Sequence, residues 1–409
     1  MSTKKQITKL YANHVSPGKA DIYTKYDMVL IPGKRIGPFL YDIDGKQYIN
    51  CHSNGGVFNL GHRNPEIIRV IERAMKTYDI GNHHLISEPK ALLGKLISSI
   101  MPKGLNQVVY GVSGGEAVDF AIKFARGVTG RPDIISAQGG YHGHTGLAMA
   151  AGDGKFRDKF GPTTPGFQQV PFNDVESIEK ALSDKTAAVI FETIPATLGI
   201  VVPDKKFYSR VRSLCDVCGA LLILDEIQTG FGRTGTMWGF EHFKVVPDIV
   251  TLGKGMSGGL YPISATVYQE KYAGFLRTDP FVHISTFGGS EIGCCAAMEV
   301  IRISRRKAFL NHVSRMAEFF NEGLKGLSIK YPSLKLRIRG MGLMMGLEFK
   351  DEGTALLMMK LLFDQGIYLV YSGNDPKVLQ FMPVLTITKK DGEEVLKRMD
   401  HAFAKMGGL

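Results

Sequence analysis

The stretch Pro247-Asp-Ile-Val-Thr-Leu-Gly-Lys-Gly-Met-Ser-Gly-Gly-Leu-Tyr-Pro262 places one lysine, Lys254, directly after a short apolar run. The run predicts a strand over 249–252, and the glycines on either side of the lysine leave its backbone uncovered. An amine held there has room on both sides for a flat group. By itself the stretch also fits a surface lysine in a glycine turn. A nucleotide-binding P-loop is excluded, because that loop needs Ser or Thr after the lysine and Gly255 follows it.

A second stretch, Leu221-Leu-Ile-Leu-Asp-Glu-Ile-Gln-Thr-Gly-Phe-Gly-Arg-Thr-Gly235, ends another apolar run with the carboxylate of Asp225. Such a carboxylate is expected at the carboxyl end of a buried strand, where ligands gather in parallel sheets. A buried anion is costly unless a cation faces it. A protonated pyridine nitrogen meets that need, and this is the requirement of pyridoxal phosphate (PLP) chemistry. There a lysine forms a Schiff base with the cofactor, and an acid keeps the ring nitrogen charged.

Together the two stretches resemble the signature of the class III (omega-type) PLP-dependent aminotransferases, which have the fold type I architecture. Further segments of the chain resemble the same family, from 59–65 (Asn-Leu-Gly-His-Arg-Asn-Pro) through 339–348 to 382–388. The resemblance therefore spans nearly the whole chain. It implies that Lys254 and Asp225 are the catalytic pair and that PLP is the cofactor.

The composition is that of an ordinary globular protein. Of the 409 residues, 44% are hydrophobic and 22% charged. No apolar run approaches the roughly 20 residues that span a membrane, and the polar N-terminus lacks the apolar core of a secretory signal, so cytoplasm is the expected compartment. The formal net charge of +11 comes from scattered lysines and arginines, which favours anionic small molecules over nucleic acid as partners. The Cys215-x-x-Cys218 pair has no second pair, so core packing is expected and no metal is predicted.

The order of apolar patterns predicts an α/β protein. A hairpin is expected over 40–49, with Asp44-Gly45 as its turn, and after residue 64 helices alternate with strands. Such alternation predicts a mostly parallel sheet, of the seven-stranded type in this family, covered by helices on both faces. Helices are expected at 4–12, 65–77, 88–100, 116–127, 205–218, 293–307 and 390–405, and strands at 107–111, 133–137, 187–191, 220–224, 249–252, 263–268, 342–349, 367–371 and 378–381.

Two domains are predicted. Residues 59–308 form the large PLP-binding domain. Residues 1–58 and 309–409 form the two parts of a small α+β domain, so that both chain ends pack together beside the large domain.

The resemblance also implies how the phosphate of the cofactor is held. Ser113, Gly114 and Gly115 follow a predicted strand and open a helix, where bare backbone amides and the helix dipole favour an anion. In the family, a threonine of the neighbouring subunit completes this cup, and the matching residue is Thr286. The resemblance therefore implies a homodimer with shared active sites, or a dimer of such dimers.

Other positions match residues that surround the cofactor ring in the family. Tyr141 matches the aromatic plate that stacks on the ring, and His142 follows it in the usual place. Glu192, at the end of a predicted strand, matches a glutamate that positions Asp225 or the substrate. Gln228 is expected to hydrogen-bond near the phenolic oxygen of the ring.

Three positions depart from the family where substrate charge is read. Relatives often carry arginine at the places of His144 and Gln380, and glutamate at the place of Thr197. Arginine suits a carboxylate because it donates two parallel hydrogen bonds. Losing the gate arginine and its glutamate together leaves no buried charge unpaired. The pocket is therefore not expected to exchange dicarboxylates in the usual way, unless another basic residue such as Arg35, or an arginine misplaced by alignment near Gln380, takes over.

The predicted function is an aminotransferase that moves an amino group between an amine or amino acid and a keto acid or aldehyde. A PLP-dependent lyase acting on a phosphorylated amine, a racemase or an aminomutase of the same family is the alternative. A non-catalytic scaffold is disfavoured, because packing alone would not require Lys254 and Asp225.

Overall fold

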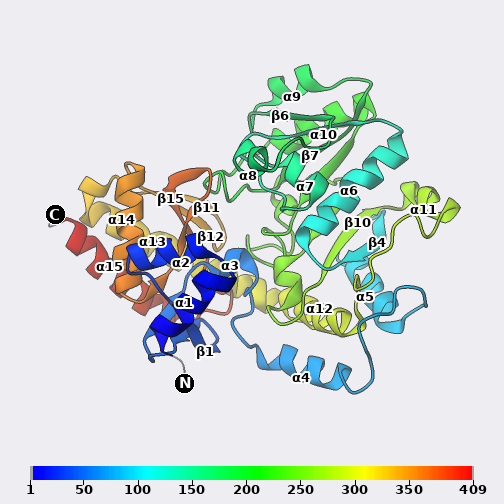
Figure 1. Ribbon diagram of the computed structural model, residues 1–409. Coiled ribbons are helices and arrows are strands. Elements are labelled where there is room, and N and C mark those ends of the chain that lie inside the picture. The colour runs from blue at the N-terminus through cyan, green and yellow to red at the C-terminus, as the bar shows by residue number, and fades with distance from the viewer. Residues whose placement is uncertain (1–2, 408–409) are drawn as a thin grey trace.

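The computed structural model describes residues 3–407 and contains one seven-stranded sheet and two four-stranded sheets. The seven-stranded sheet lies in the right-hand body of Figure 1 and the two smaller sheets in the left-hand body. Its strand order is β4-β10-β9-β8-β7-β5-β6. Its strands are β4 (Leu105–Gly111), β5 (Asp133–Ala137), β6 (Phe167–Val170), β7 (Thr186–Glu192), β8 (Leu221–Asp225), β9 (Ile249–Leu252) and β10 (Ser264–Gln269).

The seven-stranded sheet is mostly parallel, and the predicted α/β class is confirmed. The strand pairs β5·β6, β5·β7, β7·β8 and β8·β9 are all parallel, while β10 runs antiparallel to both of its neighbours. Strands β7, β8 and β9 are buried along their whole length, which explains their continuous apolar runs. Strand β6, at the edge of the sheet, was not predicted, because Gln168 and Gln169 interrupt its apolar pattern.

Helices cover both faces of this sheet because successive strand residues point to opposite sides. Leu221 and Ile223 of β8 pack in one core with α6 and α7, while Leu222 and Leu224 pack in another with α5, α10 and α12. The helices of this body are α4 (Pro65–Ala74), α5 (Glu88–Ser98), α6 (Gly114–Thr129), α7 (Gly146–Ala151), α8 (Gly154–Arg157), α9 (Val175–Ala181), α10 (Phe207–Cys218), α11 (Gly274–Thr278) and α12 (Glu291–Ser304).

The two smaller sheets combine both ends of the chain. One has the order β1-β2-β3-β13, with β1 (Pro32–Ile36), β2 (Phe39–Asp42), β3 (Gln47–Asn50) and β13 (Ile367–Tyr368). The other has the order β11-β12-β15-β14, with β11 (Arg337–Met341), β12 (Met344–Glu348), β14 (Val370–Ser372) and β15 (Asp375–Phe381). Because Ile367 pairs with Ile49, N- and C-terminal segments share one sheet. The domain limits at residues 58 and 308 stay a prediction.

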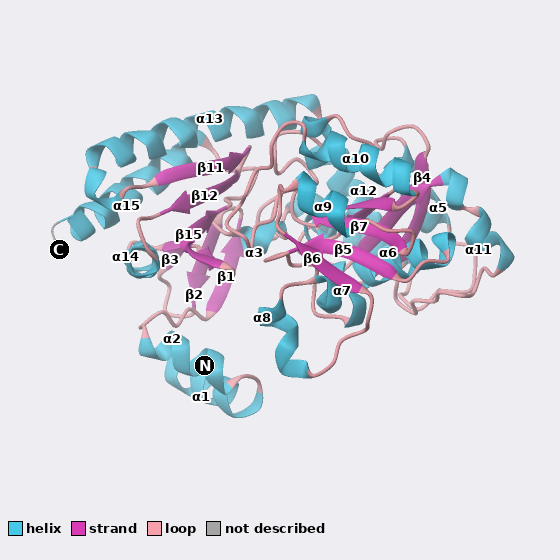
Figure 2. Cartoon of the chain, turned by 90° about the horizontal axis from the view of Figure 1, so that it is seen from above, coloured by secondary structure: helices cyan, strands magenta, loops and turns pink. Residues whose placement is uncertain are grey.

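The helices of this second body complete the architecture. Helix α13 (Lys307–Lys330) runs along one side of the β11–β12 hairpin (Figure 2), and α15 (Lys389–Gly407) packs against both α13 and α14 (Glu352–Asp364). Helices α1 (Lys4–His14) and α2 (Pro17–Lys25) pack on one another at the edge of the molecule, and the short α3 (Ser53–Gly56) leads toward the large sheet. Across residues 3–407, no helix combines the length and apolar character that a membrane crossing needs.

Two strand predictions are wrong in detail. The predicted strand over 367–371 is two strands, β13 and β14, which belong to different sheets and are separated by the buried Leu369. The apolar pattern continues through the crossing, so it cannot mark where the chain changes sheets. The predicted strand over 342–349 begins too early, because Gly342, with φ +59°, lies in the turn between β11 and β12.

Candidate active site

A cavity lies where the parallel strands of the large sheet end, and Glu192, Asp225 and Lys254 all line it. Glu192 is the last residue of β7 and Asp225 the last of β8, and the two are paired in register. Lys254 follows β9 by two residues. Carboxyl ends of neighbouring parallel strands meet at one edge of a sheet, which brings these three side chains together. The sequence patterns that singled them out thus converge on one cavity.

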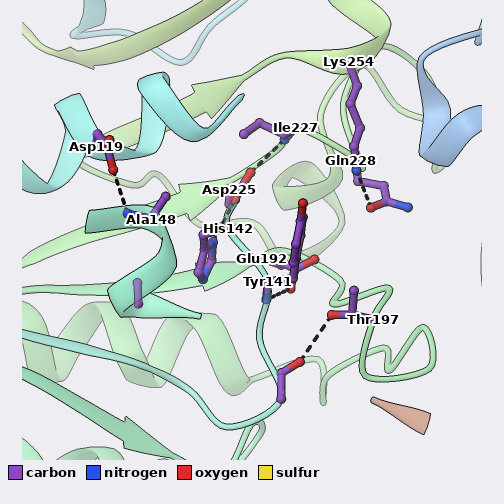
Figure 3. Close-up of polar contacts among 12 residues, drawn as sticks. Asp119, Tyr141, His142, Ala148, Glu192, Thr197, Asp225, Ile227, Gln228 and Lys254 are labelled. Carbon is purple, nitrogen blue, oxygen red and sulfur yellow. Dashed lines mark hydrogen bonds and ion pairs between the residues drawn. The ribbon is translucent and has the colours of Figure 1, made fainter. Parts of the chain in front are cut away.

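Lys254 opens a short 3₁₀ helix, Lys254–Ser257, with the left-handed φ of +39°. Its amine donates a 2.7 Å hydrogen bond to Oε1 of Gln228 (Figure 3). Burial lowers the pKa of the amine, and the nearby Glu192 and Asp225 carboxylates only partly oppose this. A lysine with a lowered pKa is more often unprotonated and so a better nucleophile.

Asp225 and His142 form the most buried polar pair of the site. Nδ1 of His142 lies 2.8 Å from Oδ2 of Asp225, and Oδ1 accepts a hydrogen bond from the backbone of Ile227 at 3.0 Å (Figure 3). Burial works against the charged imidazole of His142, but the hydrogen bond and attraction to Asp225 outweigh it and raise the pKa of His142. The aspartate is thus held rigidly beneath the cavity.

Glu192 and Tyr141 line another side of the cavity. Oε1 of Glu192 accepts the backbone N–H of Tyr141 at 2.9 Å. Burial raises the pKa of Glu192 to about 7. The ring of Tyr141 is met edge-on by the rings of His144 and Phe156, each with centroids 5.3 Å away. Two edges therefore limit how the tyrosine ring can tilt.

The start of helix α6 forms a cradle that only glycine allows. A Cβ on Gly114 would lie 2.9 Å from a methyl of Ile227, and one on Gly115 would lie 2.7 Å from the hydroxyl of Thr145. Ser113 caps the helix by accepting the backbone N–H of Glu116 at 3.3 Å. Gly114 and Gly115 line the cavity. The bare amides at this helix start suit a phosphate group.

The remaining predicted residues lie outside the cavity wall. Thr286 is exposed in this single chain, and His144 is exposed beside Tyr141. Thr197 donates to the carbonyl of Gly139 at 3.3 Å, and the buried Gln380 donates to the carbonyl of Ala196 at 3.3 Å. Arg35 is exposed on β1, away from these groups, and bonds the carbonyl of Pro32.

Two buried charged residues near the site were not predicted from the sequence. The carboxylate of Glu226 accepts four hydrogen bonds, from the hydroxyls of Thr193 and Thr229 and the backbones of Gly239 and Phe240. It thereby fixes the loop that carries Gln228. The sequence feature that could have identified Glu226 is its position directly after Asp225.

The second is Arg233, which is fully buried without a carboxylate among its partners in the described chain. It donates to the carbonyls of Leu343 and Pro383 and to the side chain of Asn59. It therefore ties the large sheet to segments from both ends of the chain. No local pattern indicates those partners.

No group of three potential metal ligands occurs in the part of the chain that the structure describes. Cys215 is buried in a core, and Cys218 lies at the end of the same helix with its Sγ 3.0 Å from the carbonyl of Ser183. Both thiols are unpaired there, as are the other three cysteines.

Comparison with known proteins decides the family. The family model described as aminotransferase class-III matches residues 22–403. The chain is a class III aminotransferase. An uncharacterized aminotransferase of Archaeoglobus fulgidus is 49% identical to it over 400 residues, covering 98% of this chain and 94% of the relative. A putrescine aminotransferase of Pectobacterium atrosepticum is 34% identical over 418 residues, covering 98% and 89%.

Solved structures agree with this assignment. The ornithine aminotransferase of Toxoplasma gondii matches this class III aminotransferase with a TM-score of 0.91 and 26% identity, over 99% of this chain and 96% of that one. A transaminase of the marine bacterium Virgibacillus also gives 0.91, with 25% identity over 98% and 99%. The architecture is thus PLP fold type I, and PLP is the cofactor. The glycine cradle at α6, facing an amine and a buried carboxylate across one cavity, fits this cofactor.

Proposed function

We propose that this class III aminotransferase moves an amino group from a primary amine, or from an amino acid with an uncharged tail, to a carbonyl acceptor, with Lys254 as the covalent and proton-carrying residue. One observation carries the proposal. The cavity joins the half-buried Lys254 amine, the buried Asp225 carboxylate and the glycine cradle of α6 in a single space.

Each group has a task that follows from its position. Gly114 and Gly115 offer backbone amides to the phosphate, with Ser113 ordering their turn. Asp225 would pair with the charged ring nitrogen of the cofactor, and His142 holds that carboxylate by its 2.8 Å hydrogen bond. Tyr141 would stack against the ring, Gln228 lies next to the lysine amine, and Glu192 supports the Tyr141 backbone. When bound, PLP supplies an aldehyde that captures amines and a ring that accepts electrons.

Lys254 is proposed to do two things. Its amine, with a pKa lowered by burial, would hold the cofactor through the cofactor's aldehyde. When a substrate amine occupies that place, the free Nζ would be the base that takes the proton from the substrate Cα and the acid that returns it. The 2.7 Å hydrogen bond to Gln228 keeps the amine within the cavity.

One observation supports a donor with an uncharged tail. Lys254 and His142 are the sole basic side chains along the cavity wall within the described residues, so no arginine there can read a carboxylate. The named relatives act on putrescine and ornithine, which supports a primary amine at the end of an aliphatic chain as the reacting group, but not an uncharged tail, because the far end of putrescine is a second amine and that of ornithine carries a carboxylate. Elimination, racemisation and amino-group migration are not favoured, because the relatives are named as aminotransferases.

A homodimer with shared sites is the proposed assembly. Exposed apolar side chains gather around Thr286 and on the neighbouring loop over 78–85, including Leu85, Phe281 and Phe287. Apolar patches of this kind usually mark protein contacts. A second copy covering the patch would bring Thr286 to the partner cavity. The cytoplasm remains the proposed compartment, in keeping with five unpaired cysteines in the chain.

The chemistry is tested by a half-reaction. The PLP-loaded protein is expected to lose its visible absorption band when a primary amine is added without any acceptor, and to regain it with a carbonyl acceptor. Borohydride treatment of the loaded protein should place the reduced cofactor on the peptide that contains Lys254. A cofactor adduct on another lysine, or an unchanged band with every amine of a broad panel, overturns the proposal.

The shared site is tested by mixing variants. Lys254→Ala is expected to be inactive and Thr286→Val to bind the cofactor weakly. A heterodimer of the two has one intact site, with Lys254 from one chain and Thr286 from the other, so each heterodimer should have half of the wild-type activity and a random one-to-one mixture about a quarter. Thr286→Val paired with wild-type chains is the control. Mixing that restores nothing contradicts a site shared in this way.

A further inference from the structure

A second cavity lies between β1 and the loop that follows α3. Four of the residues that line it are basic: Lys34, Arg35, His62 and Arg63. No residue that lines it within the described chain is acidic, and none also lines the cavity of Lys254. The basic side chains therefore belong to a site of their own, which the proposed function does not use.

Backbone pairing holds the two basic segments side by side. The N–H of Gly37 donates to the carbonyl of His62 at 3.0 Å, and the N–H of His62 donates to the carbonyl of Gly37 at 2.8 Å. Arg35 precedes this bridge by two residues, and Arg63 follows it by one. Arg63 has a left-handed φ of +52°, a conformation that persists in a residue with a side chain only where the surrounding structure holds it. The fold thus places both arginines at one cavity.

Three of the basic side chains have no anionic partner. Across residues 3–407, no carboxylate forms an ion pair with Lys34, Arg35 or Arg63. Arg35 uses one N–H on the carbonyl of Pro32, at 3.3 Å, and the Lys34 amine lies 5.6 Å from the centre of the Tyr41 ring. Most of their N–H donors are therefore free to meet a ligand.

The hydrogen bonds around His62 fix which of its ring nitrogens carries the proton. Oδ1 of Asn50 accepts the backbone N–H groups of His52 and Ser53 at 3.1 and 2.8 Å, so the other amide atom of Asn50, Nδ2, faces Nε2 of His62 at 2.9 Å. An amide nitrogen only donates, so Nε2 accepts and the proton of a neutral imidazole lies on Nδ1. Burial, and then the charge of Arg35, lower the pKa of His62 to about 4, which keeps the ring neutral at pH 7.

The Nδ1–H of His62 is a donor without a partner at the wall of this cavity. The side chain is 3% exposed, and its ring packs on Phe58, which also lines the cavity, with centroids 4.1 Å apart. Nδ1 has no hydrogen-bond partner among residues 3–407, yet it keeps some accessible surface. The cavity thus combines a nearly buried neutral donor with three cations. Such a set of donors suits an oxyanion, because carboxylate and phosphate oxygens accept hydrogen bonds.

We propose that this cavity binds the carboxylate or phosphate group of a small anionic molecule, with Arg35 and Arg63 as the charged donors and His62 Nδ1 as the neutral one. Arginine suits both groups because it donates two parallel hydrogen bonds. A neutral imidazole adds a donor without adding repulsion between the two guanidinium groups. The site is separate from the glycine cradle of α6, so the cofactor and this anion can be bound together.

The test is calorimetric titration of the PLP-loaded protein with inorganic phosphate and, separately, with acetate. The cofactor fills the cradle of α6, so added phosphate has to bind elsewhere. We expect Arg35→Gln and Arg63→Asn each to weaken binding about ten-fold, since a hydrogen bond to a charged group contributes about that factor. Asparagine is chosen at position 63 because it tolerates a left-handed φ. Arg210→Gln, at an exposed arginine of α10, is the control and should bind as the wild type does.

His62→Phe keeps a ring against Phe58 but removes the neutral donor, and should weaken binding several-fold. The arginine variants change exposed side chains, so they test the proposal even if His62→Phe does not fold. Tighter binding of phosphate assigns the site to a phosphorylated molecule, and tighter binding of acetate assigns it to a carboxylic acid. Binding of neither ion overturns the proposal, as does equal binding by both arginine variants and the control. Normal anion binding in a protein that reacts with no amine overturns the proposed function alone.

Discussion

The end of the cavity that would hold the cofactor and the end that would hold the substrate differ in the groups around them. At the cofactor end, charged groups are buried and tightly bonded: Asp225 to His142, Glu192 to the Tyr141 backbone, and Glu226 to four donors. At the substrate end, uncharged groups beside the Lys254 amine come from segments far apart in the chain: Gly55, Gln228 and, through Gln228, Met382. We infer that the cofactor end determines whether any amine reacts, and that the substrate end determines which one. Buried charges with satisfied hydrogen bonds tolerate little change, whereas uncharged groups can vary without leaving a charge unpaired in apolar surroundings.

The largest expected effect is at the junction of the two ends. On the proposed function, Lys254→Ala would remove both the amine that anchors the cofactor and the group that moves the Cα proton. Turnover should fall by about 10⁴-fold, the upper range for loss of a positioned acid or base. Steady-state turnover with any reactive amine measures this, with Lys205→Ala, an exposed lysine, as the matched control. Turnover at the wild-type level in Lys254→Ala would show that Lys254 has no part in the reaction.

Asp225→Asn keeps the shape of the cofactor end but removes its anion. On the proposed function the ring nitrogen would lose its charged partner, and the pKa of His142 should fall because Asp225 is what raises it. Turnover should drop by about 10²- to 10³-fold, as for other lost electrostatic partners in active sites. Kinetics and the histidine resonances of the variant test this, with the exposed Asp216→Asn as control. An equal loss in both variants would contradict a role specific to the site.

The pH dependence of the free energy of unfolding tests how the buried Glu192 affects stability. Glu192 has a folded-state pKa of about 7 against an ordinary value of 4.5, so the folded state holds a proton that the unfolded state has lost. Its contribution is complete below about pH 4.5 and declines as pH rises through 7, by up to about 3 kcal/mol. Denaturant unfolding of the cofactor-free protein at pH 5 and pH 8 should show this loss, and Glu192→Gln should reduce it. The exposed Glu179→Gln should leave the loss unchanged.

Glu226→Gln tests the hydrogen bonding of the cofactor end without touching the reacting groups. The amide nitrogen of glutamine would face one of the four donors, so at least one of them loses its acceptor. The free energy of unfolding should fall by about 1–3 kcal/mol, which calorimetry would register as a melting temperature lower by several degrees. An unchanged melting temperature would mean that the loop carrying Gln228 is held by other contacts.

The smallest effect is expected at the exposed rim of the substrate end. His144→Ala removes a ring that meets Tyr141 edge-on but is itself exposed. Substitutions at exposed positions usually change free energies by no more than about 0.5 kcal/mol, so kcat/KM should change by only two- to three-fold, with cofactor affinity unaltered. A large loss of cofactor affinity would place His144 with the cofactor end instead.

Much of the cofactor end could be predicted from the sequence. Asp225 and Glu192 each end an apolar run, Lys254 follows one, and Gly114 precedes a helix. Local patterns of this kind suffice because the carboxyl ends of parallel strands always share one edge. The substrate end was less accessible. Gln380 was singled out, but Ala196, whose carbonyl accepts its hydrogen bond, was not, because the two residues lie 184 positions apart in the sequence.

By itself, the sequence determined the α/β class, the parallel strands and the residues at their ends, because apolar periodicity and strand-end polarity are local properties of the chain. Only the tertiary structure decided where the chain changes sheets at Leu369, which segments Arg233 ties together, and that Gly55 lies next to the Lys254 amine. These contacts depend on the packing of distant segments, and packing follows shape and hydrogen-bond geometry that no local pattern records.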